Sequence, residues 1–219
     1  IHITDPNSGR HLKVNQSGAP LDEVHFNHFK LLFRQHLRNA QMVAIGGSLP
    51  PSRPTDSYAD LVGLANEREI PVLIDTIGEP LREVLAEKPF IVKPNCHELS
   101  RTLDQDLETH EDVLEGAREL QKIGAQSVVV TDGANPVIAA HGKEAWIAYP
   151  PQIEVNGPTG AGDALAAGLL DALSRGRKFR DALGYGVAVS AACCLTPEGE
   201  LTRSKDIPRM LKLVKVEKL

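Results

Sequence analysis

The stretch Val-Asn-Gly-Pro-Thr-Gly-Ala-Gly-Asp-Ala, residues 155–164, decides how the rest of this 219-residue chain is interpreted. It ends a loop and opens a helix that is rich in small and apolar residues over positions 164–173. Gly160 and Gly162 leave room for an anion beside the backbone, and the first N–H groups of a helix, at the positive end of its dipole, have no partner within the helix. Asp163 lies in the first turn, where a carboxylate can accept a proton from a hydroxyl that attacks a phosphoryl group. The alternative is an ordinary glycine-rich connection, and Asp163 favours the chemical interpretation.

The composition is that of a globular protein with a mildly acidic surface. Hydrophobic residues make up 42% and charged residues 24% of the chain, and the formal net charge is −5. This charge argues against nucleic acid or an anionic membrane as a partner. Cys96, Cys193 and Cys194 have no disulfide or zinc spacing, which favours a reducing, cytoplasmic location. No apolar run approaches the roughly 20 residues of a membrane span.

Strand-like and helical segments alternate along most of the chain. Strands are expected at residues 42–45, 72–75, 90–93 and 127–131, and helices over residues 21–38, 58–65, 81–86 and 111–122. This alternation predicts βαβ units and a mostly parallel sheet that helices cover on both faces. A hairpin at the sheet edge is expected from residues 137–140 and 145–149, followed by helices over residues 160–173, 180–194 and 206–214.

The N-terminal residues form a separate pattern. Residues 1–4 and 11–14 are strand-like and flank a turn over residues 5–9, as in a β-hairpin. Because the chain opens directly on this hairpin and has no initiator Met, we expect it to be truncated at its N-terminus.

Polar clusters follow four of the expected strands. They are Gly46-Gly47-Ser48, Asp75-Thr76, Lys93-Pro94-Asn95 and Thr131-Asp132-Gly133. In open α/β sheets, ligands bind beyond the carboxyl ends of the strands. Together with the helix start at residue 160, these clusters predict one binding site along one rim of the sheet.

The segment Lys-Pro-Asn-Cys-His-Glu-Leu, residues 93–99, is the second informative motif. Asn95 and Glu98 are three residues apart, so in a helical first turn they lie on the same side. Their oxygens suit Mg²⁺ that keeps much of its water. The same spacing also fits a capping box at a helix start, and the two interpretations are compatible. Cys96 and His97, without metal-ligand spacing to other residues, are expected to be surface residues of this helix.

Residues 159–163 resemble the D/N-x-x-G-A-G-D signature of the ribokinase-like (PfkB) carbohydrate kinases. The resemblance implies that the amides of Gly160, Ala161 and Gly162 form an anion hole and that Asp163 is the catalytic base. Thr159 would then lie beside the nucleotide. The chain departs from the pattern after Asp163, where many members carry Phe or Ser.

The form V-K-P-N-x-x-E-L is typical of the branch of this family that contains 1-phosphofructokinase and tagatose-6-phosphate kinase. By this resemblance Lys93 contacts a nucleotide phosphate as a point charge, and Asn95 and Glu98 handle Mg²⁺. Asn95 is also assigned to nucleotide binding.

Three further segments resemble family motifs around the substrates. Thr131 and Gly133 match a S/T-x-G-A-x-G turn near the nucleotide, although Pro136 replaces its last glycine and removes an N–H donor. Gly47 and Ser48 match a G-S-L-P-P stretch near the sugar phosphate. Small residues around Ala191 are expected beside adenine.

The family resemblance implies a three-layer α/β/α fold, with residues 1–15 as the remnant of a small β lid and residues 16–219 as the kinase core. A homodimer through the lid is an expectation. With part of the sugar-binding portion absent from the sequence, we expect the chain to be at best weakly active.

The implied reaction is transfer of the ATP γ-phosphoryl group to a phosphorylated ketohexose, with fructose 1-phosphate to fructose 1,6-bisphosphate as first choice. The alternatives are a tagatose-6-phosphate kinase or another sugar or nucleoside kinase of the same fold. A non-catalytic nucleotide-binding protein is disfavoured because Asp163, Asn95 and Glu98 are intact.

Overall fold

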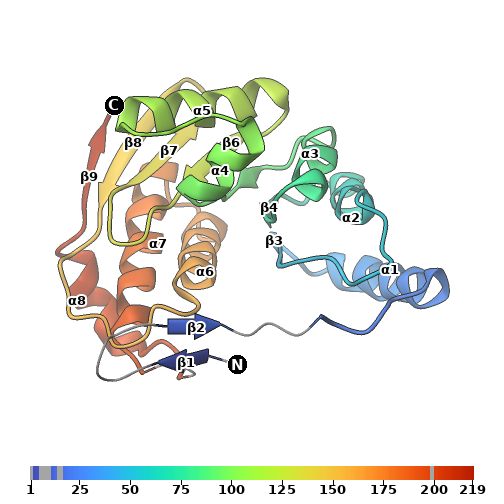
Figure 1. The fold of residues 1–219 in the computed structure, drawn as a ribbon, viewed down its shortest axis with the longest axis horizontal. Helices are drawn as coiled ribbons and strands as arrows, with labels where there is room; N and C mark the ends of the chain where they lie inside the picture. Colours follow the sequence, from blue (N-terminus) through green and yellow to red (C-terminus); the bar gives the residue numbers. More distant parts are fainter. Residues whose placement is uncertain (1, 5–10, 14–16, 198–199) are drawn as a thin grey trace.

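The computed structural model describes residues 2–4, 11–13, 17–197 and 200–219 (Figure 1). The main body has eight α-helices within these residues: α1 (Glu23–Leu37), α2 (Ser57–Asn66), α3 (Glu79–Leu85), α4 (Cys96–Leu103), α5 (His110–Ile123), α6 (Ala161–Ser174), α7 (Phe179–Cys194) and α8 (Ile207–Leu211). Its strands are β3 (Val43–Gly46), β4 (Val72–Asp75), β5 (Ile91–Val92), β6 (Ser127–Val130), β7 (Val137–His141), β8 (Glu144–Tyr149) and β9 (Lys215–Lys218).

The strands of the main body form one mixed sheet in the order β3-β4-β5-β6-β7-β8-β9. The pairs from β3 to β6 are parallel, because a helix or helix pair connects each strand to the next. From β6 onward the pairs are antiparallel. The parallel part of the sheet is therefore β3–β6, and its carboxyl ends lie along one rim.

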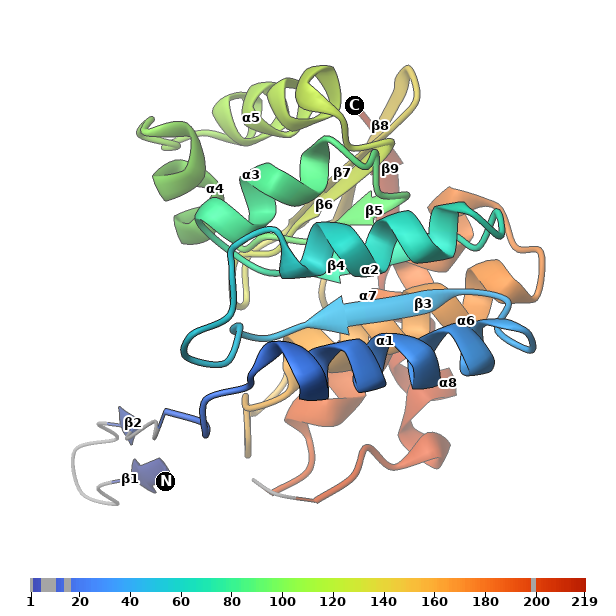
Figure 2. The same ribbon diagram turned by 90° about the vertical axis from the view of Figure 1, so that its right-hand side faces the viewer.

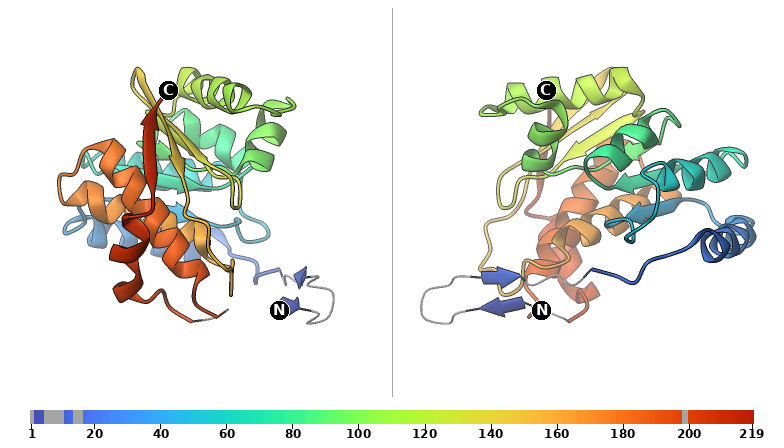
Figure 3. Two further views of the ribbon diagram at one scale, coloured as in Figure 1. Left: turned by 90° about the vertical axis from the view of Figure 1, so that its left-hand side faces the viewer. Right: turned by 45° about the vertical axis from the view of Figure 1, so that its right-hand side comes forward.

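Helices cover both faces of the sheet, as Figures 2 and 3 show. Alternate side chains of the strands pack on opposite sides: Ile74, Val92 and Val128 join the cluster under α1–α5, whereas Leu73 and Ile91 join the cluster under α6 and α7. This alternation follows from the two-residue period of a strand and makes a buried strand apolar throughout. The expected three-layer α/β/α fold is confirmed.

The C-terminal segment differs from expectation. The helix expected over residues 206–214 is the short α8, and the chain then forms strand β9. Because β9 pairs with β8 (Ala148 opposite Val216), the hairpin β7–β8 lies inside the sheet and not at its edge. The segment Lys-Val-Glu-Lys has too few apolar residues for its sequence to predict a buried strand. It forms a strand because it pairs with β8.

The expected hairpin is present near the N-terminus. Strands β1 (His2–Thr4) and β2 (His11–Lys13) pair antiparallel, with Ile3 opposite Leu12, and project from the main body as a separate two-stranded sheet (Figure 3). The expected turn at residues 5–9 lies outside the described residues. Among the described residues, no helix has both the length and the apolar character needed to cross a bilayer.

Helix α1 is only partly covered. Phe26 and Leu37 are buried, as the helical period predicts, and Phe33 is partly buried against the same cluster. Phe29 lies three residues after Phe26 and four before Phe33, so the helical period places it on the same apolar face, yet it is 46% exposed. It lies at the flank of the helix, where it stacks between the rings of Phe26 and Phe33 instead of entering the sheet layer.

His141 gives the fold a pH-dependent stability. Its Nδ1 lies 2.7 Å from Ser127 Oγ, and its ring stacks on Phe179 with centroids 4.5 Å apart. Burial lowers the pKa of His141 below its usual value of 6.5, although the charge of Glu144 opposes the shift. The unfolded chain therefore takes up a proton at a higher pH than the folded chain does, and stability falls as pH drops through about 6.5 toward the folded-state pKa.

We expect the urea midpoint to decrease between pH 7.5 and pH 5.5, and His141→Gln, which can still hydrogen-bond to Ser127, to show a smaller decrease. His28→Gln, at an exposed position of α1, is the matched control. An equal pH dependence of the wild-type protein and His141→Gln would contradict this assignment.

Candidate active site

Four strand ends and one helix start meet at the carboxyl rim of the parallel strands. Gly46 lies opposite Asp75 in the β3–β4 register, and beyond β5 and β6 an isolated bridge pairs Asn95 with Thr131. The Thr131 carbonyl accepts the Cys96 N–H at 2.8 Å, which continues the ladder past the strands. The sheet itself therefore places the predicted polar clusters side by side.

A buried ion pair lies at the centre of this rim. Lys93 Nζ is 2.8 Å from Asp75 Oδ2, and the lysine side chain is only 5% exposed, against 25% for the aspartate. Lys93 follows β5 and Asp75 ends β4, and the parallel register brings the two positions level on the face that α6 covers. Burying an ammonium without a counter-charge is costly, and the Asp75 carboxylate offsets this cost at Lys93.

The start of α6 lies next to this ion pair. Gly160, the N-cap, has φ 83°, a conformation that favours glycine. A Cβ at Gly162 would lie 3.3 Å from Lys93 Nζ, so the ammonium lies directly against the first turn of the helix. The helix dipole and the ammonium both place positive potential at this point, which is therefore suited to an anion.

The predicted site residues of α6 differ in their surroundings. Asp163 lies in the first turn and is exposed to solvent. The Ala161 N–H donates to the Pro158 carbonyl at 3.2 Å, so an anion bound there would share or replace this contact. Thr159 lies in the preceding loop, and its carbonyl is 3.9 Å from the Cys193 Sγ at the end of α7.

Asn95 and Glu98 form the capping box of α4. Glu98 N–H donates to Asn95 Oδ1, and Asn95 N–H donates to Glu98 Oε2, each at 2.8 Å. Each side-chain oxygen can accept more than one hydrogen bond, so capping does not exhaust the acceptor capacity of the pair. The capping alternative is thus realised, and it fixes both side chains at the rim.

The Thr131–Gly133 turn borders a cavity. Gly133 has φ 54°, and Asn135 closes the turn through hydrogen bonds to Asp132. A cavity of about 250 Å³ opens beside it, lined by Cys96, Leu107, Glu108, Thr109, His110, Val113, Val130, Asp132, Asn135, Pro136 and Ile138. Burial and the charge of Asp132 raise the pKa of Cys96, so its thiol is protonated at neutral pH.

A larger hollow of about 760 Å³ runs between α1, α2 and α3 and contains none of the predicted site residues.

The loop after β3 is fixed at its first residues. Gly47, at φ 92°, donates its N–H to the Asp75 carbonyl at 3.1 Å. Its own carbonyl accepts hydrogen bonds from Thr76 Oγ1 at 3.2 Å and from the Tyr58 hydroxyl at 3.3 Å. Ser48 follows and is exposed on the rim.

Ala191 is a predicted site residue that is almost fully buried. It lies in α7 and is 6% exposed, within an apolar cluster that includes Ala188, Ala192 and Met210. Its side chain contributes to the core between α7 and α8, so a nucleotide base would meet the surface of this cluster and not Ala191 alone.

The described residues offer few ligands for a metal ion. Among the residues that the structure describes, no group of three or more His, Cys, Asp or Glu side chains is placed to hold a metal ion. Asn95 and Glu98 together provide two oxygen ligands. This number suits Mg²⁺ whose other ligands are water and nucleotide phosphates, the usual binding mode of this ion. The two side chains do not form a protein cage.

The sequence places Asp75 and Thr76 in one of the four polar clusters of the rim, but it does not predict that Asp75 pairs with Lys93. It also does not predict that Thr76 and Tyr58 bind the Gly47 carbonyl. The sequence does contain a signal for the Asp75–Lys93 pair, since two successive strands are followed or ended by residues of opposite charge. The ends of neighbouring parallel strands lie level in the sheet, so such residues come close together.

Taken together, the rim has a buried cation against a helix start and an exposed carboxylate in the same helical turn. These are the parts that positioning and charge stabilisation of a phosphoryl group require, on a three-layer α/β/α scaffold.

Comparison with known proteins identifies the family. Residues 2–205 match the model of the pfkB family of carbohydrate kinases. The chain belongs to this family, which confirms the resemblance inferred from its motifs.

Two relatives are 1-phosphofructokinases. The Borreliella burgdorferi protein is 29% identical over 213 residues, covering 96% of this chain and 67% of the relative. The Rhodobacter capsulatus protein is 35% identical over 195 residues, covering 87% of this chain and 60% of the relative. The chain thus spans only about 60–67% of the length of these proteins.

Solved structures agree with the fold. A possible 1-phosphofructokinase from Thermotoga maritima aligns with a TM-score of 0.89 at 25% identity, covering 100% of this chain and 70% of that one. Phosphofructokinase-2 from Escherichia coli, in complex with potassium, aligns with a TM-score of 0.88 at 26% identity, covering 96% and 69%.

The asymmetric burial of the central ion pair gives a prediction. Asp75→Asn leaves the Lys93 ammonium buried without a counter-charge, and breaking such a pair costs about 3–5 kcal/mol. Lys93→Met leaves a carboxylate that is already one-quarter exposed and can be hydrated, so it should cost less. We expect Asp75→Asn to lower the free energy of unfolding more than Lys93→Met.

Urea unfolding at pH 7.5 measures both variants, and Asp171→Asn, at the exposed Asp171–Arg175 pair of α6, is the control. The double variant Asp75→Asn/Lys93→Met should be more stable than Asp75→Asn alone. Equal losses for the two single variants would contradict the buried-ammonium interpretation.

Proposed function

We propose that the protein transfers the γ-phosphoryl group of ATP to a hydroxyl of a phosphorylated ketohexose, with fructose 1-phosphate converted to fructose 1,6-bisphosphate. The observation that carries this proposal is the Lys93 ammonium, held by Asp75 and lying against the start of α6. Family membership makes ATP the expected co-substrate. The names of the two 1-phosphofructokinase relatives support the choice of sugar.

In this proposal α6 binds the transferred group. The amides of Gly160, Ala161 and Gly162 stabilise its negative charge, and the helix dipole adds to them. Asp163 accepts the proton of the attacking hydroxyl. Its exposed position in the first turn leaves the carboxylate free to approach a substrate from the solvent side.

The nucleotide lies along the ends of β5 and β6. Lys93 contacts a phosphate, and Asn95, Thr131, Gly133 and Thr159 line the binding region. We place adenine over the apolar cluster of α7 that includes Ala191.

The sugar phosphate contacts the loop after β3 through Gly47 and Ser48. Its reactive hydroxyl points to Asp163. The hydrogen bond from Gly47 N–H to the Asp75 carbonyl supports this arrangement, because it ties the sugar loop to the strand that holds Lys93.

We further propose that Mg²⁺ is the cofactor, held by nucleotide phosphates and water with help from Asn95 and Glu98. When bound, it would neutralise phosphate charge. The chain's own contribution is to fix these two side chains at the rim through the capping box.

The domain and cellular assignments also remain proposals. We assign residues 1–15 to a β lid, with residues 16–219 as the kinase core, and propose that two copies associate through the lid. The cysteine content supports a cytoplasmic location.

A panel of acceptors tests the reaction. ADP formation should be fastest with fructose 1-phosphate, compared at equal concentration with tagatose 6-phosphate, fructose 6-phosphate, fructose and a nucleoside. A preference for tagatose 6-phosphate would select the alternative kinase. ATP binding without phosphorylation of any acceptor would favour a non-catalytic nucleotide-binding protein.

Asp163→Asn tests the base. The substitution is nearly isosteric, so ATP affinity and thermal stability should stay unchanged while turnover falls about 10²–10⁴-fold, the contribution of a positioned general base. Isothermal titration with ATP and an ADP-release assay measure the two properties. Turnover within a few-fold of the wild-type protein would exclude Asp163 as the base.

Glu98→Gln tests the metal assignment. Gln can also complete a capping box, so the helix start should be retained. We expect the Mg²⁺ concentration for half-maximal activity to increase, with a smaller change in the requirement for sugar phosphate. Thr109–Asp112 forms the other capping box, so Asp112→Asn is the matched control and should leave the Mg²⁺ requirement unchanged.

A further inference from the structure

Arg53 is an almost fully buried arginine at the far end of the proposed sugar loop. Its side chain is only 5% exposed, although it lies in a surface loop just before Pro54. The guanidinium carbon is 3.9 Å from the centroid of the Phe26 ring, and Nη1 donates to Glu23 Oε2 at 2.9 Å. An arginine in this setting is held in one conformation by stacking and by charge at the same time.

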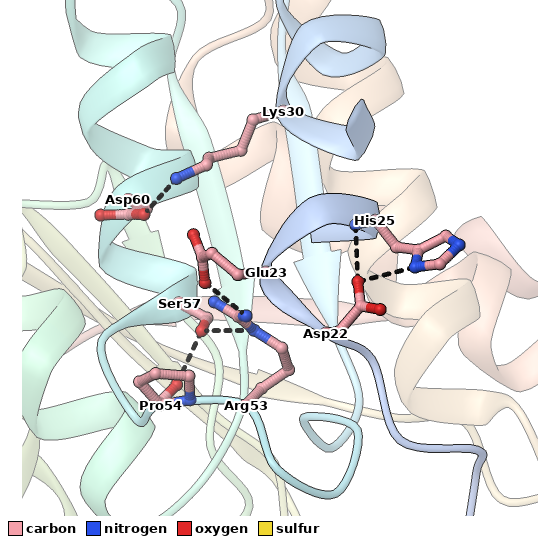
Figure 4. Close-up of polar contacts among 8 residues, drawn as sticks. All are labelled: Asp22, Glu23, His25, Lys30, Arg53, Pro54, Ser57 and Asp60. Atoms are coloured by element: carbon pink, nitrogen blue, oxygen red, sulfur yellow. Dashed lines mark hydrogen bonds and ion pairs between the residues drawn. The ribbon is translucent and has the colours of Figure 1, made fainter. Parts of the chain in front are cut away.

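These contacts connect the loop to two helices. Phe26 and Glu23 belong to α1, whereas Ser57, whose Oγ accepts from Arg53 Nε at 3.3 Å, begins α2 (Figure 4). The Lys30–Asp60 ion pair, at 2.9 Å, joins the same two helices nearby. Arg53 thus attaches the end of the loop to the point where α1 and α2 meet.

The loop between Gly47 and Arg53 is consequently fixed at both ends. At its start Gly47 is held by Asp75, Thr76 and Tyr58, as described above. Near its end Ser52 has φ 69°, a left-handed conformation that is unfavourable for a residue with a Cβ. The Arg53 N–H donates to the Pro50 carbonyl at 3.2 Å and closes the turn that contains Ser52. Such a conformation persists only where the surrounding contacts enforce it.

Arg53 does not reach a ligand directly, because its guanidinium lies between Glu23, Phe26 and Ser57. Any effect on the substrate must therefore pass through the loop. We propose that Arg53 is a positioning residue that holds residues 47–52 in the conformation that receives the sugar phosphate. This inference rests on the proposed function, which assigns Gly47 and Ser48 to that substrate.

Three variants separate the components of the attachment. Arg53→Met keeps apolar contact with Phe26 but removes the charge, and Arg53→Lys keeps the charge but loses the planar stack. Glu23→Gln weakens only the ion pair. Arg34→Met is the matched control, because Arg34 is an exposed arginine of α1 that lies 3.9 Å from Glu67.

Two measurements on this chain are required: amide hydrogen exchange of residues 46–52, and affinities for fructose 1-phosphate and for ATP with Mg²⁺ by calorimetry. For Arg53→Met we expect about tenfold faster exchange in the loop and about tenfold weaker binding of fructose 1-phosphate, close to the lower end of what one hydrogen bond to a charged group contributes. ATP affinity should stay within about twofold, because the guanidinium of Arg53 contacts Glu23, Phe26 and Ser57, none of which is assigned to the nucleotide. Arg53→Lys should recover part of both losses, and Arg34→Met should match the wild-type protein.

Three results would overturn the inference. They are unchanged loop exchange in Arg53→Met, faster exchange with unchanged affinity for fructose 1-phosphate, and an equal loss of affinity for ATP and the sugar phosphate, which would indicate general destabilisation. If the wild-type protein binds none of the sugar phosphates while its loop is protected from exchange, the proposed function fails, and the substrate role of Arg53 fails with it. If the wild-type protein binds fructose 1-phosphate tightly and Arg53→Met binds it equally well, the positioning role of Arg53 is refuted and the proposed function is not.

Discussion

The ion pair between Lys93 and Asp75 is the interaction on which the arrangement of the rim depends. It joins the ends of two parallel strands and places an ammonium against the first turn of α6. Two positive features, the ammonium and the helix dipole, would repel each other in a buried environment without the carboxylate. The Asp75 carboxylate therefore allows the fold to bury the ammonium beside the start of α6.

Close packing of α6 on α7 fixes the direction of this helix start. A Cβ at Gly168 would lie 2.7 Å from Val189 Cγ2, and one at Gly186 would lie 2.9 Å from the Leu165 carbonyl. Both glycines are needed because the two helices approach too closely for larger side chains. The helix axis, and with it the orientation of the first N–H groups at Gly160–Gly162, is set by contacts well away from the rim.

Two kinds of contact hold the loops of the rim in place: backbone hydrogen bonds that continue the sheet, and side-chain contacts from neighbouring helices and strands. The Asn95 and Thr131 segments extend the sheet ladder and need little else. The loop after β3 continues beyond the last strand pair, Gly46 with Asp75, and it relies on side chains at both ends, Tyr58 and Thr76 at one and Arg53 at the other. Its geometry thus depends on α1 and α2 as much as on the sheet.

The sequence by itself determined the features that arise within a few residues of one another. The spacing of apolar residues in strands and helices predicts the α/β fold. The three-residue spacing of Asn95 and Glu98 predicts the capping box that the structure contains. The glycines at residues 160 and 162 marked the start of α6. Only the tertiary structure decided the pairing of β9 with β8, the ion pair of Asp75 with Lys93 and the stacking of Arg53 on Phe26. Each of these joins positions 18 to about 70 residues apart whose proximity is set by strand order and helix packing, and no local pattern of polar and apolar residues encodes which distant partner a charged side chain will meet.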